Sequence, residues 1–116
     1  MWLDENHITH EVFKNDVEIT ADDIVEILDA RKKLIKGRKG PILADIRHIK
    51  SVSKEARDFG NNEDGIRITT AFGILVGAPI SRMIGNFFIG VTKPPYPTRL
   101  FTEKDKAIEW LNGYVE

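Results

Sequence analysis

The segment from Asp45 to Arg57, DIRHIKSVSKEAR, holds most of the side chains that could do chemistry. It contains a carboxylate, a histidine, several bases and two serines, and an apolar run, PILADI, leads into it. If that run is a buried parallel strand, these side chains follow its carboxyl end. Ligands of wound α/β sheets usually lie at this edge, where helix N-termini offer unpaired amides. The sequence therefore predicts a binding surface here.

We expect the ligand or partner surface to combine polar side chains from the ends of two strands and from the helices that follow. These residues are Asp45, Arg47, His48, Ser51, Ser53, Lys54, Arg57, Ser81 and Arg82. Arg47 and His48 could bind an anion through charge-assisted hydrogen bonds, although a solvated strand end is the simpler interpretation. Ser51 and Ser53 are typical helix-capping residues, with a regulatory serine as the alternative.

Catalysis would require a nucleophile beside a base, and His48 with Ser51 or Ser53 is the pair that the sequence offers. The glycine pattern of a nucleophile elbow is missing, so we expect no enzyme activity and no catalytic residue. His7 and His10 are three positions apart in a predicted strand and point to opposite faces, which argues against a shared metal. The sequence thus predicts neither a metal site nor a cofactor.

Composition limits the class of protein further. The chain has 116 residues and a formal net charge of -1, so nothing attracts it as a whole to nucleic acid or acidic membranes. It has no cysteine, which excludes disulfides and thiol chemistry. The basic run from Arg31 to Lys39 reads as a solvated helix end rather than a nucleic-acid site.

Targeting signals are not evident. The N-terminus, MWLDENHITHEVF, carries acids where a signal peptide needs a basic region, so we expect a cytoplasmic protein. The most apolar stretch, AFGILVGAPI, is about half the roughly 20 residues that a membrane-spanning helix requires. We expect no membrane insertion.

The elements that must position these residues follow from periodicity and capping. Alternation in the first thirteen residues predicts an N-terminal β-hairpin, and strands are expected at Pro41–Ile46, Ile68–Gly77 and Thr98–Phe101. Helices are expected from Thr20 to Gly37, from Ser53, from Pro79 and after Thr102, with capping boxes pairing Thr20 with Asp23 and Thr102 with Asp105. GNNEDG, residues 60–65, predicts turns. The whole chain, 1–116, is expected to be one α/β domain with a hairpin followed by four alternating β-α units and a mostly parallel wound sheet.

The helix from Pro79 has a second possible role. An apolar stripe should cover one face of the sheet; it consists of Ile80, Met83, Ile84, Phe87 and Phe88. Ile89 extends the apolar surface beyond this stripe, and Gly85 permits close approach by another backbone. We expect this surface to be either a seam for a homodimer or the wall of a small pocket.

The segments PILADIRHIKSVSKEAR, IGNFF, KPPYPTRLF and FTEKDKAIEWL resemble bacterial proteins of the SpoIIAA-like group, which is similar to the STAS domains (sulfate transporter and anti-sigma factor antagonist). The resemblance implies a superhelix of four β-α turns. In STAS switch proteins a strand aspartate, here Asp45, precedes an Asp-Ser-Ser-Gly type motif with a phosphorylated serine. Ser53 falls at the aspartate of that motif, and Lys54 and Glu55 fall at its serines.

The resemblance thus implies a non-enzymatic regulatory or protein-interaction module without the usual phosphoserine switch, bound by a protein partner still to be identified. The alternative is a domain that binds a small apolar or anionic molecule in a pocket between the helix from Pro79 and the sheet.

Overall fold

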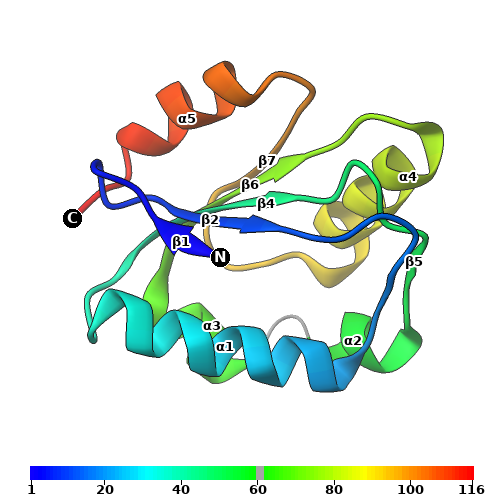
Figure 1. Cartoon of the computed structure of the whole chain (residues 1–116), viewed down its shortest axis with the longest axis horizontal. Helices are drawn as coiled ribbons and strands as arrows, with labels where there is room; N and C mark the ends of the chain where they lie inside the picture. Colours follow the sequence, from blue (N-terminus) through cyan, green and yellow to red (C-terminus); the bar gives the residue numbers. More distant parts are fainter. Residues whose placement is uncertain (60–61) are drawn as a thin grey trace.

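The computed structural model describes residues 1–59 and 62–116 and places helices on both faces of a central five-stranded sheet (Figure 1). Strand β1 (Trp2–Leu3) pairs antiparallel with β2 (Thr9–Val12). Strands β4 (Gly40–Asp45), β6 (Thr69–Leu75) and β7 (Thr98–Phe101) then continue parallel to β2, in the order β1-β2-β4-β6-β7. The predicted hairpin and the mostly parallel sheet are confirmed.

The helices divide between the two faces of the sheet. Helix α5 (Lys104–Asn112) lies on one face, and α1 (Ala21–Ile35), α2 (Lys54–Phe59) and α3 (Glu63–Ile68) lie on the other (Figure 1). Helix α4 (Pro79–Phe87) continues into a π-helical turn, η1 (Phe88–Thr92). Within the described residues, no helix is both long enough and apolar enough to cross a bilayer.

Strand register assigns each side chain to one face. Glu11 pairs with Ala44, and Ala44 pairs with Ile74, so these three side chains share a face. Leu43 and Leu75 point the opposite way and pack with Ala107 and Leu111 of α5. Because helices cover both faces of the sheet, consecutive side chains of β2, which point to opposite faces, are buried.

Side-chain caps fix where helices α1 and α2 begin. Thr20 Oγ1 accepts a hydrogen bond from the Asp23 amide (3.3 Å), and the Asp23 carboxylate accepts one from the Thr20 amide (2.8 Å), which confirms the first capping box. Ser53 Oγ accepts from the Ala56 amide (3.0 Å) at the start of α2, as predicted. The second box is wrong: α5 has Glu103 at its N-cap and no side-chain cap.

Two local features differ from expectation. Glu63 to Gly65 form the start of α3 rather than a turn, because the Asn62 side chain accepts a hydrogen bond from the Gly65 amide (2.9 Å) and caps the helix. Gly60 and Asn61 of the same predicted turn lie outside the described residues. A small second sheet, in which β3 (Glu18–Ile19) pairs parallel with β5 (Ser51–Val52), was not predicted.

Helix α4 docks through small residues instead of its whole apolar stripe. Its buried residues are Ser81 and Gly85, whereas Ile80, Met83 and Phe87 are exposed. A Cβ added to Gly85 would sit 2.6 Å from Leu100 Cδ2, so the glycine lets α4 approach β7 closely. The expectation that Gly85 lies open to the backbone of a second copy is therefore wrong, because Leu100 of the same chain occupies this position. Ile89 is half-buried in η1, and association through it stays a prediction that sedimentation of the wild type against Ile89→Glu tests.

Candidate functional site

The predicted anion-binding arginine at the end of β4 already has a partner. Arg47 Nε and Nη2 donate to the two carboxylate oxygens of Asp45, at 3.0 and 2.8 Å. Burial favours a raised pKa for Asp45, but the hydrogen bonds from Arg47 outweigh it and hold the pKa below its ordinary value. The side-chain stem of Arg47 also lies against Gly77. This bidentate pair leaves less of the guanidinium for a ligand.

The three serines of the predicted surface each have a structural partner. Ser81 Oγ is buried, accepts from the Gly77 amide (3.0 Å) and donates to the Ala78 carbonyl (2.9 Å). Ser51 Oγ donates to the Glu18 carboxylate (3.0 Å), and Ser53 caps α2. The hydroxyls therefore stabilise local structure.

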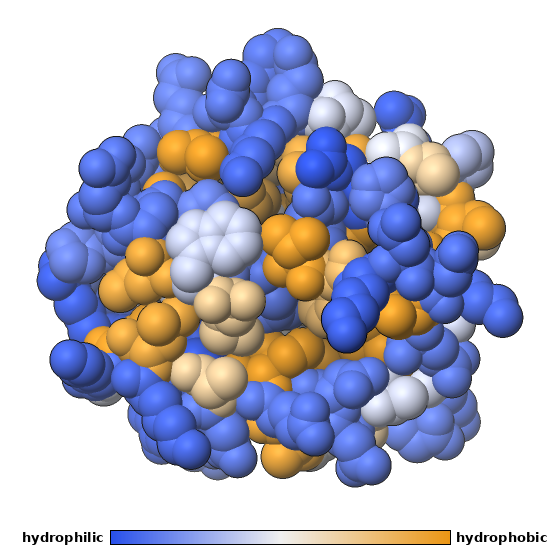
Figure 2. Space-filling model, in the orientation of Figure 1, coloured by the Kyte–Doolittle hydropathy of each residue, from blue (hydrophilic) through white to orange (hydrophobic). Residues whose placement is uncertain are grey.

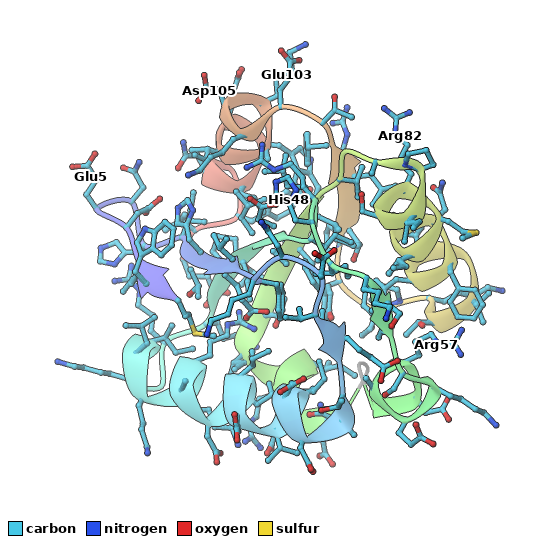
Figure 3. All side chains as sticks on the ribbon, turned by 45° about the vertical axis from the view of Figure 1, so that its right-hand side comes forward. Glu5, His48, Arg57, Arg82, Glu103 and Asp105 are labelled. Carbon is cyan, nitrogen blue, oxygen red and sulfur yellow. The ribbon has the colours of Figure 1, made fainter. Side chains whose placement is uncertain are left out.

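The charged members of the predicted surface do not converge. Figure 3 shows His48, Arg57 and Arg82 well apart, with Arg82 directed into solvent. The Arg57 guanidinium lies 4.9 Å from the centroid of the Phe87 ring and so joins α2 to the end of α4. Lys54 is exposed beside it. The nine residues thus fall into two groups, one around Asp45 and Ser81 and one along β5 and α2, and their contact with a partner stays a prediction.

A cavity of about 440 Å³ lies between the sheet and the helices α1, α2 and α4, where the ligand-binding alternative expected a pocket. Its walls are mainly apolar side chains that point from the sheet, from α1 and from α4. They include Phe13, Ile19, Ile24, Ile27, Leu28, Ile42, Ala44, Ile46, Phe72, Ile74, Ile84 and Phe88. Figure 2 shows hydrophobic side chains reaching the surface within a mainly hydrophilic face. The cavity is of ordinary size for a small-molecule site.

Two buried ionisable side chains, Glu11 of β2 and Arg31 of α1, also line the cavity. Glu11 is 8% exposed and Arg31 is 3% exposed. Arg31 Nη1 donates to Thr69 Oγ1 (2.8 Å), and Nη2 donates to the carbonyls of Gly40 (3.1 Å) and Ile68 (3.2 Å). Arg31 is thereby held at the amino-terminal ends of β4 and β6, while Glu11 projects from the middle of β2.

Hydrogen bonding in this pair is incomplete. Glu11 Oε2 and Arg31 Nε are buried without a hydrogen-bond partner among the residues that the structure describes. Glu11 and Arg31, both described, form no ion pair within 4.0 Å. Buried polar groups in proteins are almost always satisfied, and the exceptions often mark sites for water or a ligand.

Burial changes the acid–base behaviour of both groups. It raises the pKa of Glu11 to about 7, against the opposing field of Arg31. It lowers the pKa of Arg31 to about 10, although Glu11 and Tyr96 act in the opposite direction. At neutral pH Arg31 is therefore charged, and Glu11 is close to the midpoint of its titration.

The mouth of the cavity is built by α4. Ile80, Met83 and Phe87 line the cavity and are also exposed, with Met83 at 66%. Arg57, which lies over Phe87, lines it from the α2 side. These side chains belong to the stripe that was expected to cover the sheet, and they border an opening instead.

Sequence reasoning missed the two buried charged residues of the cavity, Glu11 and Arg31, although Ser51 and Arg57 of the predicted surface also line it. Glu11 was grouped with the alternating residues of a hairpin, and Arg31 was placed in a solvated basic run, which is wrong because Arg31 is buried. A signal for Glu11 existed: Phe13 lies on the same side of the strand, so that side carries an apolar residue as well. A signal for Arg31 existed too: it lies seven residues after Ile24 and four before Ile35, at helical spacing with the apolar residues of α1.

Comparison with known proteins supports the fold and assigns no activity. The chain is similar in structure to an uncharacterised protein from the DUF3478 family with a SpoIIAA-like fold, from Shewanella loihica PV-4. The TM-score is 0.62 at 19% sequence identity, over 86% of this chain and 82% of that chain. No curated protein matches the sequence. A family model, described as a domain of unknown function (DUF7793), matches residues 1–115, so this chain with a SpoIIAA-like fold belongs to the DUF7793 family.

Proposed function

We propose that this domain binds a small, largely apolar molecule in the cavity between the sheet, α1 and α4, without catalysing a reaction. The observation that carries the proposal is the cavity of about 440 Å³ whose apolar walls end at a buried carboxylate and a buried guanidinium. Small-molecule sites have this design, with apolar walls for affinity and a few polar groups for orientation.

The position of the cavity in the fold supports binding. Its walls come from elements far apart in the sequence, since Ala44 and Ile74 face it from the sheet and Ile84 faces it from α4. Dense cores leave few voids larger than a water molecule. A ligand would cover these apolar walls and so gain the free energy of removing them from water.

The arrangement of possible catalytic groups supports a non-enzymatic role. His48, the candidate base, is exposed, and the hydroxyls of Ser51 and Ser53 are engaged with Glu18 and the Ala56 amide. A general base must lie within hydrogen-bond reach of its nucleophile. We therefore propose that the chain binds a ligand and that none of these residues has a catalytic role.

Binding is tested with diphenylhexatriene, a hydrocarbon probe that fluoresces in apolar surroundings. We expect saturable binding by the wild type at one site. Ala44→Leu fills the cavity from the sheet and should abolish the signal, whereas Ala30→Leu adds the same side chain on the exposed face of α1 and should leave it unchanged. Equal binding by wild type and Ala44→Leu would contradict the proposal.

A regulatory or protein-interaction module is the second candidate, favoured by exposed apolar residues along α4 and η1. Met83 and Val91 are both more than half exposed, and Arg57 and Lys54 lie next to this row on α2. Larger exposed apolar patches often mark interaction sites. The test is a native pull-down with the wild type, Met83→Glu and Arg47→Ala. A partner that is retained by both variants does not use these residues.

A further inference from the structure

We propose that Glu11 and Arg31 form the recognition end of the cavity and bind an uncharged alcohol or carboxamide group at the end of an apolar ligand. This inference rests on the proposed binding function and adds the chemical class of the ligand. The relevant property of such a group is that it accepts one hydrogen bond and donates another.

The unpaired atoms of the cavity match the chemistry of such a ligand. Arg31 Nε–H is a donor without an acceptor, and Glu11 Oε2 is an acceptor without a donor, among the residues that the structure describes. Both residues line the cavity and both are more than nine-tenths buried. A hydroxyl or carboxamide satisfies both atoms at once, because its oxygen accepts from Nε–H and its O–H or N–H donates to Oε2.

The guanidinium of Arg31 is held in one place. Three hydrogen bonds, to Thr69 Oγ1 and to the carbonyls of Gly40 and Ile68, hold the two Nη atoms of Arg31. These bonds use three of the five N–H groups, and Nε is the nitrogen of this guanidinium that is left without any acceptor among the described residues. Glu11 and Arg31 form no ion pair within 4.0 Å. Both line the same cavity and each acts electrostatically on the other, so a ligand in the cavity can contact both.

Charge also favours a neutral ligand. Once Glu11 is ionised, above about pH 7, it supplies the countercharge of Arg31, so a neutral group then disturbs the balance of the site least. A carboxylate would bring a second negative charge into a buried region and would require Glu11 to be protonated, while an ammonium would be repelled by Arg31. Beyond this pair the walls are mainly apolar, with Lys50 and Arg57 as further cations.

The ligand class has a consequence for pH dependence. The charged groups that act on Glu11 are Arg31 of α1 and the N-terminal amino group, and Tyr96 acts on Arg31 from the segment before β7. A donor from a neutral ligand favours ionised Glu11, so its affinity should rise severalfold between pH 6 and pH 8. A carboxylate ligand requires protonated Glu11, so its affinity should fall over the same interval.

The experiment measures displacement of diphenylhexatriene by four probes with one chain length: octan-1-ol, octanamide, octanoate and octylammonium. We expect octan-1-ol and octanamide to bind at least tenfold more tightly than the two charged probes at pH 7.5. Glu11→Gln keeps the shape of the side chain but removes its charge. It should weaken binding of the neutral probes about tenfold, abolish their pH dependence and leave binding of diphenylhexatriene unchanged.

Thr9→Val is the matched control. Thr9 is buried on the same face of β2, two residues before Glu11, but it does not line the cavity. Its replacement should leave the affinity of all four probes and the pH dependence unchanged, which separates recognition by Glu11 from general damage to the strand.

The outcomes separate this inference from the proposed function. If diphenylhexatriene does not bind, the binding function itself fails. If diphenylhexatriene binds but octane displaces it as well as octan-1-ol does, water satisfies the two polar atoms. The proposed recognition end is then overturned, while the binding function stands. Preference for octanoate with affinity falling above pH 7 would likewise overturn the neutral ligand class.

Discussion

Glu11 and Arg31 are the residues whose placement is energetically most demanding. Charged side chains are almost never fully buried unless they are paired, and here the pair is separated and incompletely hydrogen-bonded. Burial of Glu11 without a donor to Oε2 destabilises the folded state whenever the carboxylate is ionised. Such a cost is acceptable where the group serves binding.

This cost predicts an unusual pH dependence of stability. Glu11 binds its proton more tightly in the folded protein, with a pKa of about 7, than in the unfolded chain, with a pKa of 4.5. The folded state thus holds more protons between these values, so its stability falls as the pH rises through this window, by about 3 kcal/mol in total. Glu11→Gln removes the linkage, and the stability of this variant relative to the wild type should increase from pH 4.5 to pH 7.

Urea denaturation of both proteins across this interval measures the effect. Glu26→Gln, which changes an exposed glutamate on α1, is the control and should follow the wild type at every pH. A constant difference between Glu11→Gln and the wild type would show that Glu11 has an ordinary pKa.

Substitutions of Ser53 test whether its side chain stabilises the start of α2 by capping. Its Oγ accepts from the Ala56 amide at 3.0 Å, so Ser53→Ala should destabilise the domain by about 1 kcal/mol. Ser53→Asp should be nearly neutral, because aspartate also caps and its charge suits the positive end of the helix. Thermal denaturation compares the two, and equal damage by both variants would contradict the capping role.

At the scale of elements, the contact between α4 and β7 shapes the cavity mouth. Gly85 brings the helix onto Leu100 and Val76, and the apolar side chains on its other positions remain at the opening. Ser81 adds two hydrogen bonds to the segment before the helix. Small residues thus determine which face of α4 docks, although larger apolar residues are available.

Gly85→Ala should therefore destabilise the protein. The new Cβ would lie 2.6 Å from Leu100 Cδ2 and 3.3 Å from Val76 Cγ1, so Leu100 must change its rotamer or α4 must shift. We expect a loss of about 1–3 kcal/mol, as for other overpacked sites. Gly90→Ala is the control, because an added Cβ there meets nothing within 4 Å; it should be neutral or stabilise by up to about 1 kcal/mol. Equal unfolding midpoints for the two variants would show that the close approach is unimportant.

At the scale of the whole molecule, the two faces of the sheet differ in packing. The face toward α5 is filled by a continuous core that includes Leu43, Leu75 and Leu111, and the opposite face encloses the cavity. The same substitution on the two faces should therefore have opposite effects. This contrast gives a test of the cavity that needs no ligand.

Ala44→Leu extends into the cavity, so its added methyl groups are buried without displacing other atoms; stability should be unchanged or higher by about 1 kcal/mol. Ala71→Leu adds the same atoms to the fully buried α5 face and should cost about 1–3 kcal/mol. Chemical denaturation measures both. Comparable destabilisation by the two variants would mean that the space beside Ala44 is not available.

Much of the fold was predictable because it depends on local signals. The capping box of Thr20 and Asp23, the proline that opens α4 and the apolar runs of β4 and β6 each act within a few residues, and the structure confirms them. Alternation of such elements then restricts the topology to a wound sheet. The cap at Thr102 failed because Glu103, one residue later, is the N-cap of α5, and such small shifts of a helix end are not encoded in spacing alone.

The candidate site was decided by tertiary structure. Residues 45–57 hold a set of polar groups that looks functional, but their hydrogen bonds turn out to be largely local, as in the pairing of Arg47 with Asp45. Glu11 and Arg31 are twenty positions apart and carry no motif. They line the same cavity because the fold places β2 and α1 around it, and burial by distant elements depends on the whole chain rather than on any window of sequence.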